Sequence, residues 1–147
     1  MRGYVNFSHD GLRDSLTYLA APPLFYEYLR RELAAAHRNR TELALLQFNI
    51  IPQVSEVGSI YEVAILNFSQ LLKNEIRSED MCARLGRFEF TLILRTSIDA
   101  ARQVAQRVRN SWHDENFLCT TGVVIAKKDE SPDRKSTRLN SSHITIS

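Results

Sequence analysis

Apolar positions along the chain alternate between helical and strand spacing in an order that predicts a mixed α/β (α+β) fold. The expected order is helix, strand, helix, strand, strand, helix, strand. The helices span about 22–37, 59–77 and 97–112, and the strands 43–51, 81–85, 88–95 and 117–126. Without the leading helix this is a ferredoxin-like βαββαβ core, with a central and mostly antiparallel sheet flanked by helices.

Local signals set several of these boundaries. Ser59 and Glu62 have the spacing of a capping box, in which each side chain satisfies a free backbone N–H at the helix start. Ser97 is a suitable N-cap for the last helix. The run 43–51 contains few polar residues, so we expect a strand that is buried on both faces.

A tight hairpin is predicted between the two middle strands. Gly86 and Arg87 form its loop, and a glycine at the first loop position is typical of a type II′ turn. In the strand that follows, Phe88 and Phe90 share one face and Glu89 lies on the other. The hairpin therefore exposes one carboxylate next to the turn.

Composition is that of a globular domain. The chain has 147 residues, of which 44% are hydrophobic and 24% are charged, so one domain with its own core is expected. No apolar run approaches the roughly 20 residues of a membrane helix. Cys82 and Cys119 lie in apolar stretches without metal-ligand spacing, which indicates reduced core residues of a cytoplasmic protein.

The last fifteen residues distort the charge of the chain. Back-translation of residues 133–147 resembles a widely used sequencing adapter, and the alternative is an ordinary Ser/Thr/Arg-rich disordered tail. We therefore expect a domain at 1–132 and a non-native, disordered tail at 133–147. The tail holds Arg134, Lys135 and Arg138 against Asp133, a net charge of +2 that equals the charge of the whole chain. Residues 1–132 are neutral, which gives no support for a nucleic-acid partner.

Four segments resemble, in order, the motifs of one known protein family. Residues 14–19 are similar to the D-x-L-T-x-L segment of that family, and residues 43–48 to its first strand. Residues 83–90 align without a gap on A-R-L-G-G-D-E-F, and residues 120–124 resemble its late S-I-G-V-A strand. These are the motifs of GGDEF domains, the family of diguanylate cyclases. The chain is identified as a degenerate member of this family, which implies its nucleotidyl cyclase-like fold.

The departures from the family pattern concern its catalytic residues. The signature turn reads G-R-F-E-F from Gly86 to Phe90. Arg87 replaces a glycine that lets the backbone approach GTP, and Phe88 replaces an acidic residue used for metal and catalysis. Only Glu89 remains of the acidic pair, and Asn49 occupies the position of a metal-binding aspartate. The resemblance thus implies no catalytic residue, no metal site, and neither Mg²⁺ nor GTP as a cofactor.

One binding motif of the family is retained. Arg77 and Asp80 form an R-x-x-D sequence that ends five residues before the signature. In the family this is the inhibitory site for cyclic di-GMP, and it often borrows another arginine from a neighbouring domain or a second subunit. The alternative is a surface ion pair at a helix end.

These features lead to one main hypothesis and two alternatives. The main hypothesis is a catalytically inactive, cytoplasmic module of bacterial signalling that binds cyclic di-GMP and regulates an attached sensor or output domain. The second is a ligand-independent scaffold that acts through dimerisation, as a homodimer, and the last is an active cyclase. Family members continue into a further helix and a closing segment after the position of residue 127, so we also expect marginal stability of this fragment.

Overall fold

The computed structural model describes residues 9–126 and contains the predicted elements in the predicted order. The elements are α1 (Pro22–Asn39), β1 (Leu43–Pro52), α2 (Ile60–Glu75), β2 (Met81–Gly86), β3 (Glu89–Leu94), α3 (Ile98–Ser111) and β4 (Phe117–Ala126). The predicted tail at 133–147 lies outside the described residues, as does the end of the predicted domain after residue 126. None of the helices between residues 9 and 126 is long and apolar enough to cross a membrane.

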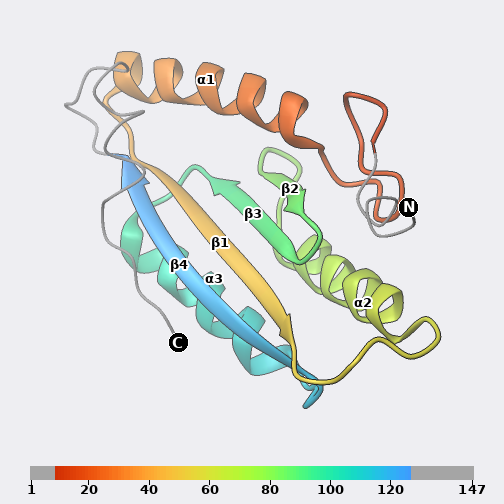
Figure 1. Cartoon of the computed structure of the whole chain (residues 1–147). Coiled ribbons are helices and arrows are strands. Elements are labelled where there is room, and N and C mark those ends of the chain that lie inside the picture. Colours follow the sequence, from red (N-terminus) through yellow and green to blue (C-terminus); the bar gives the residue numbers. More distant parts are fainter. Residues whose placement is uncertain (1–8, 127–147) are drawn as a thin grey trace.

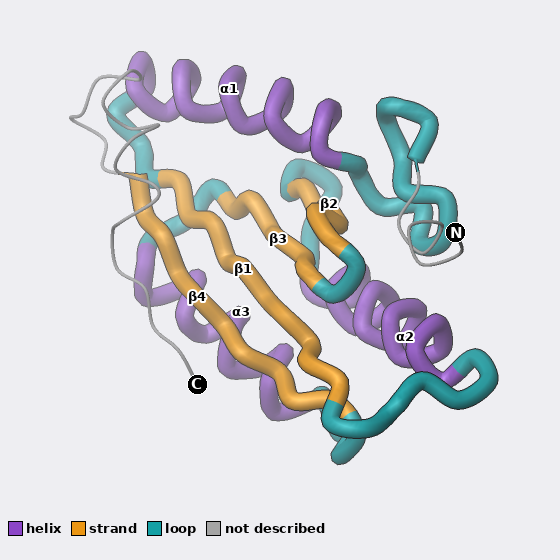
Figure 2. The backbone as a smooth tube through the Cα atoms, viewed as in Figure 1, coloured by secondary structure: helices purple, strands orange, loops and turns teal. Residues whose placement is uncertain are grey.

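The four strands form one antiparallel sheet in the order β2-β3-β1-β4, which confirms the predicted α+β core (Figure 1). β1 lies in the centre, with Phe48 opposite Phe90 of β3 and opposite Thr121 of β4. Figure 2 shows the helices against this sheet, with α1 apart from α2 and α3. The first strand of the chain thus becomes one of the two inner strands of the sheet, together with β3.

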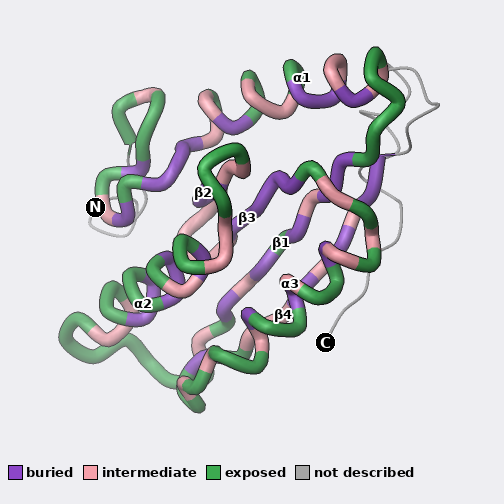
Figure 3. The backbone as a smooth tube through the Cα atoms, turned by 180° about the vertical axis from the view of Figure 1, so that it is seen from behind, coloured by how far each residue is buried: buried purple, intermediate pink, exposed green. Residues whose placement is uncertain are grey.

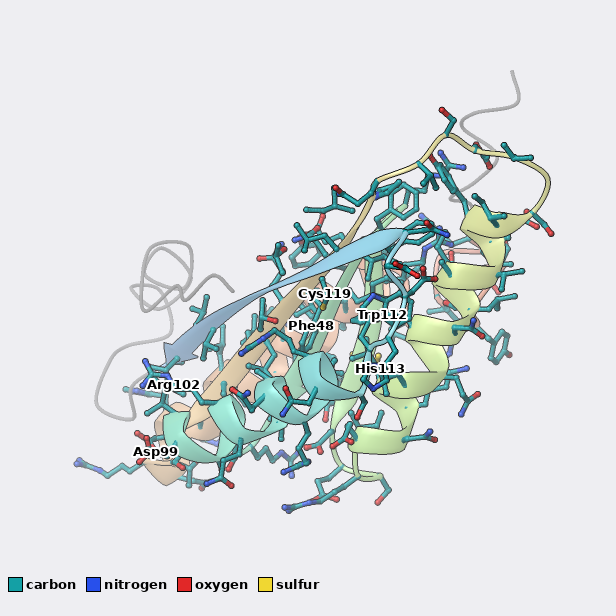
Figure 4. The ribbon with its side chains drawn as sticks, turned by 90° about the horizontal axis from the view of Figure 1, so that it is seen from below. Phe48, Asp99, Arg102, Trp112, His113 and Cys119 are labelled. Carbon is teal, nitrogen blue, oxygen red and sulfur yellow. The ribbon has the colours of Figure 1, made fainter. Side chains whose placement is uncertain are left out.

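The larger part of the core lies between the sheet and the helices α2 and α3. Phe68 of α2 is at its centre, with its ring centroid 5.7 Å from that of Phe48, 5.1 Å from that of Phe90 and 5.2 Å from that of Trp112. Figure 4 shows α2 and α3 side by side across this face, with Phe48 between them and the sheet. Figure 3 shows that the exposed positions gather on loops and on the outer sides of helices.

The opposite face of the sheet is covered over only part of its length. Leu43 and Leu45 pack beneath α1, whereas Gln47 and Ile51 further along β1 are exposed. The prediction of a strand buried on both faces is therefore wrong for the second half of β1. The second half of β1 is exposed because α1, the one helix on this face among the described residues, covers only the other end of the sheet.

The two predicted helix caps have different outcomes. Ser97 is confirmed as the cap of α3, because its Oγ accepts a hydrogen bond from the N–H of Ala100 at 3.3 Å. Ser59 makes no such bond, and its φ of −108° and ψ of 23° lie outside the extended range of an N-cap. The predicted capping box is therefore wrong. α2 also ends at Glu75, two residues earlier than expected, which leaves Arg77 in the following turn.

Candidate functional site

The hairpin between β2 and β3 is built differently from the predicted one. Gly86 is still in β2 and pairs with Glu89, so the loop residues are Arg87 and Phe88. Gly86 does not have a positive φ, which excludes the predicted type II′ turn. A Cβ on Gly86 would lie 3.3 Å from Oε1 of Glu89. The glycine therefore provides space for Glu89 rather than an unusual backbone conformation.

Arg87 folds back onto the protein. Its guanidinium donates to Oε2 of Glu56 at 2.9 Å and lies 5.1 Å from the ring centroids of both Tyr61 and Phe88. Tyr61 in turn donates its hydroxyl to the carbonyl of Val54 at 2.6 Å. These contacts fasten the loop between β1 and α2 to the hairpin turn. The surface at the turn is consequently occupied by side chains of the chain itself.

Phe88, at the position of a family carboxylate, contributes to the hydrophobic core. Its ring centroid lies 5.5 Å from that of Tyr61 and 6.2 Å from that of Phe117. The ring thus points toward the face that carries α2 and α3. An acidic residue here would remove one ring from this aromatic cluster, and the apolar contacts of that ring would be lost.

Glu89 faces the opposite, partly uncovered side of the sheet. Its Oε2 accepts a hydrogen bond of 2.7 Å from Nε2 of Gln47, and its strand neighbour in register is Asn49. The structure thus brings the predicted residues Asn49 and Glu89 together and adds Gln47, which the sequence analysis missed. Gln47 lies two positions before Asn49 on the same strand face, and this alternation is the signal that could have identified it.

The set at this position contains one carboxylate and two amides. Among residues 9–126 no group of three or more His, Cys, Asp or Glu side chains is arranged to hold a metal ion. Divalent Mg²⁺ is usually bound through one or two carboxylates together with substrate phosphates. Glu89 therefore supplies the one negative charge of this set, and one of its two carboxylate oxygens accepts from the amide of Gln47.

A buried ion pair connects the hairpin turn to the segment that precedes α1. Nη1 of Arg84 lies 2.9 Å and 3.1 Å from the two carboxylate oxygens of Asp14, and neither side chain is exposed. The guanidinium also donates to the carbonyl of Arg87, at 2.9 Å from Nη2. Burial lowers the pKa of Arg84, and the carboxylate of Asp14 opposes this effect. The entry segment and the turn are therefore joined through one charged group.

The second candidate site is the turn between α2 and β2, which carries the R-x-x-D motif. Asp80 donates its N–H to the carbonyl of Arg77 at 3.0 Å, and its Oδ2 accepts from the N–H of Arg77 at 3.0 Å. The side chain of Arg77 is 79% exposed, and its closest acidic partner is Glu79 at 3.6 Å. The alternative of a surface ion pair at the helix end is therefore present in the structure, with Glu79 as the partner of Arg77.

A hollow of about 160 Å³ lies beside this turn. Its lining includes Arg77 and Asp80, Arg95 at the end of β3, and Arg107 of α3, which is paired with Glu75 at 2.9 Å. No motif in the sequence singled out Arg95 or Arg107 for this site. The structure thus brings three arginines to one hollow, and each of them has a carboxylate partner, at 3.6 Å for Arg77, 2.6 Å for Arg95 and 2.9 Å for Arg107.

The two cysteines are free thiols. Cys82 is buried in β2 and Cys119 is half-buried in β4. Burial raises the pKa of Cys82 to about 12 and that of Cys119 to about 11. Both thiols are therefore protonated at neutral pH, which makes them weak nucleophiles and weak metal ligands.

Comparison with known proteins places this geometry in context. A family model described as "Diguanylate cyclase, GGDEF domain" matches residues 12–121. Over 136 residues the chain is 23% identical to diguanylate cyclase DgcS of Shewanella oneidensis, an alignment that covers 85% of this chain. It covers 46% of that protein, so the chain spans about half the length of this curated relative.

Solved structures share the fold. The coiled coil and GGDEF domain of DgcB from Caulobacter crescentus, in complex with c-di-GMP, has a TM-score of 0.71 at 18% identity, covering 90% of this chain and 78% of that one. The GGDEF domain of FimX from Pseudomonas aeruginosa has a TM-score of 0.74 at 15% identity, with coverage of 87% and 88%. Diguanylate cyclase SiaD from Pseudomonas aeruginosa, in complex with its activator SiaC, has a TM-score of 0.68 at 20% identity, with coverage of 88% and 55%.

Proposed function

Because the chain belongs to the GGDEF domain family, we propose that it is a non-catalytic member that binds cyclic di-GMP and passes this signal to an attached domain. The observation that carries the proposal is the state of the signature hairpin. Arg87 is held by Glu56, and Phe88 is part of an aromatic cluster. The two positions on which cyclisation depends therefore have structural roles in this chain.

Chemistry at the hairpin supports the loss of activity. Forming a cyclic dinucleotide from GTP requires a 3′-hydroxyl held near metal and neutralisation of the triphosphate charge. Here Glu89 is the remaining carboxylate of the signature, and it accepts from Gln47. Incubation with GTP and Mg²⁺ should yield neither linear pppGpG nor cyclic product. Formation of either one refutes the non-catalytic assignment.

The binding part of the proposal depends on Arg77 and Asp80. A guanidinium can donate two parallel hydrogen bonds to guanine O6 and N7 or to a phosphate, and a carboxylate can accept from the N1 and N2 hydrogens of guanine. Arg77 is exposed enough to turn toward a ligand. The DgcB structure named above is a complex with c-di-GMP, which supports this ligand class. Calorimetric titration of cyclic di-GMP into the full chain tests it.

The size of the hollow indicates how such a ligand would be held. Small-molecule sites usually measure about 300–1,000 Å³. The 160 Å³ beside Arg77 can take one phosphate or one guanine edge, but not a dinucleotide. The rest of the ligand would lie against a second surface, supplied by an attached domain or another subunit. The two free thiols agree with a reducing compartment such as the cytoplasm.

A ligand-independent dimerisation module is the second candidate. Ile51 and Leu118 are neighbours across β1 and β4, and their exposed fractions are 41% and 53%. Together they form an apolar pair at the uncovered end of the sheet. Such a pair favours contact with another protein surface, although two residues alone are a small patch.

A further inference from the structure

Arg95 connects the R-x-x-D hollow to helix α1. It follows the last residue of β3, and its guanidinium binds Glu32 of α1 through two parallel hydrogen bonds. Nε lies 2.6 Å from Oε1 and Nη2 lies 2.7 Å from Oε2. The side chain of Glu32 is 11% exposed, whereas that of Arg95 is 56% exposed. The carboxylate is thus fixed within the protein, and the guanidinium lies at the surface.

The same residue lines two hollows. It lines the small hollow together with Arg77, Asp80 and Arg107. It also lines a larger hollow of about 730 Å³, which lies along the second half of α1 and includes Glu32. Arg95 therefore stands on the wall between α1 and the ligand-binding motif. Rotation about its side-chain bonds would turn its charge from one hollow to the other.

A second contact joins α1 to the motif itself. The hydroxyl of Tyr28, one turn before Glu32, donates to the carbonyl of Glu79 at 2.7 Å. Glu79 is the third residue of the R-x-x-D sequence. Burial raises the pKa of Tyr28, and the carboxylate of Glu32 acts in the same direction. Helix α1 thus contacts the backbone of the motif through Tyr28, and through Glu32 it holds Arg95, which lines the hollow beside the motif.

We propose that Arg95 is a second cationic ligand of the cyclic di-GMP site, beside Arg77 and Asp80, and that it changes partner, from Glu32 in the free chain to the ligand in the complex. The inference rests on the proposed function, because it assigns an additional residue and a regulatory consequence to the same site. A guanidinium keeps its charge at all physiological pH values, so only its partner can change. Binding of a phosphodiester then removes one attachment of α1 to the sheet.

The competition follows from electrostatics. Glu32 is nearly buried, so loss of Arg95 leaves its carboxylate without a counter-charge, which disfavours the bound state. An anionic ligand compensates by binding the released guanidinium. Ligand and Glu32 therefore compete for one cation, and by reciprocity the ligand weakens the attachment of α1 to the same degree that this attachment weakens the ligand.

This competition predicts opposite effects of two substitutions on the dissociation constant of cyclic di-GMP. Calorimetric titration uses the full chain, with Arg102→Gln as a matched control, because Arg102 is an exposed arginine of α3 that does not line the hollow (Figure 4). Arg95→Gln should weaken binding by about tenfold, the effect of losing one charge-assisted pair of about 1.4 kcal/mol. Glu32→Gln should tighten binding by about threefold, because it removes the competitor.

The double variant and hydrogen exchange complete the test. In the Arg95→Gln background, Glu32→Gln should have no further effect on affinity, and in the wild-type chain the ligand should speed exchange of the amides of α1. Suppose that the wild-type chain binds but that both substitutions shift the affinity in the same direction, or that each shifts it by less than about twofold, as in the control. The partner change is then refuted, whereas the binding site stands. If the wild-type chain does not bind at all, the proposed function itself fails. Urea unfolding of each variant verifies that it is folded.

Discussion

Arg84 and Asp14 form an ion pair from which solvent is excluded, with a shortest distance of 2.9 Å between guanidinium and carboxylate. The pair joins the segment that precedes α1 to the strand that precedes the signature turn. Asp14 also accepts from the N–H and the hydroxyl of Thr17, each at 2.7 Å. Each polar atom of the carboxylate thus has a partner, as a buried charge requires.

Removal of one member of this pair should destabilise the fold strongly. In an Arg84→Met variant the carboxylate of Asp14 stays buried without its counter-charge, which costs about 3–5 kcal/mol of unfolding free energy. Urea unfolding measures this loss. Addition of Asp14→Asn to that variant should recover part of the stability, because the unpaired charge is gone. A single variant within about 1 kcal/mol of the wild type would contradict a structural role of the pair.

Restoring the glycine of the signature should not restore activity. An Arg87→Gly variant loses the contact with Glu56 and the ring contacts with Tyr61 and Phe88. We expect faster hydrogen exchange over residues 53–59, because the loop is no longer fastened to the turn. With GTP and Mg²⁺ the variant should still form no pppGpG, since Phe88 leaves Glu89 as the one carboxylate of the signature. Cyclic product from this variant would show that Arg87 alone blocks a competent site.

Stability should fall above pH 9 because of Cys82. The thiol has a pKa of about 12 in the folded chain, raised by burial from an ordinary value of 9.0. Between these two values the unfolded chain releases the proton and the folded chain keeps it, so rising pH favours unfolding. Below pH 9 the thiol is protonated in both states and has no such effect. Urea unfolding at pH 8 and pH 10.5 should show a smaller decrease for Cys82→Ala than for the wild type, and an equal decrease would contradict this assignment.

The scaffold alternative has its own test. If Ile51 and Leu118 mediate self-association, analytical ultracentrifugation of the full chain should detect a dimer that an Ile51→Lys, Leu118→Lys variant does not form. Both side chains are exposed, so these charges should change the unfolding free energy by about 0.5 kcal/mol or less. A wild-type chain that stays monomeric at high concentration would contradict this alternative.

The sequence predicted the elements of this fold better than their mutual register. The alternation of β3 was predicted correctly, with Phe90 on the core face and Glu89 on the other, because a period of two is a local property. The hairpin was wrong because the ladder includes Gly86, with an irregularity between Arg84 and Gly86. Pairing with the opposite strand decided that position, and a local turn pattern does not record it.

The candidate site was predicted in part for the same reason. Asn49 and Glu89 were both identified, but their proximity depends on a strand pairing between residues 40 positions apart. The same pairing brings Gln47 next to Glu89. Arg95 had no motif that could have revealed it. Its relation to Glu32 and to the hollow beside Arg77 exists only once α1, β3 and the R-x-x-D turn are packed together.

Titration of cyclic di-GMP into the full chain by calorimetry is the most direct test of the central claim. The Arg77→Ala, Asp80→Ala variant is compared with a matched control, Asp99→Ala, Arg102→Ala, which removes the same two residue types from the exposed side of α3 (Figure 4). We predict micromolar binding by the wild type and the control, and loss of binding in the Arg77 and Asp80 variant. A folded wild-type chain that releases no heat of binding, or a variant that binds as tightly as the wild type, would contradict the account.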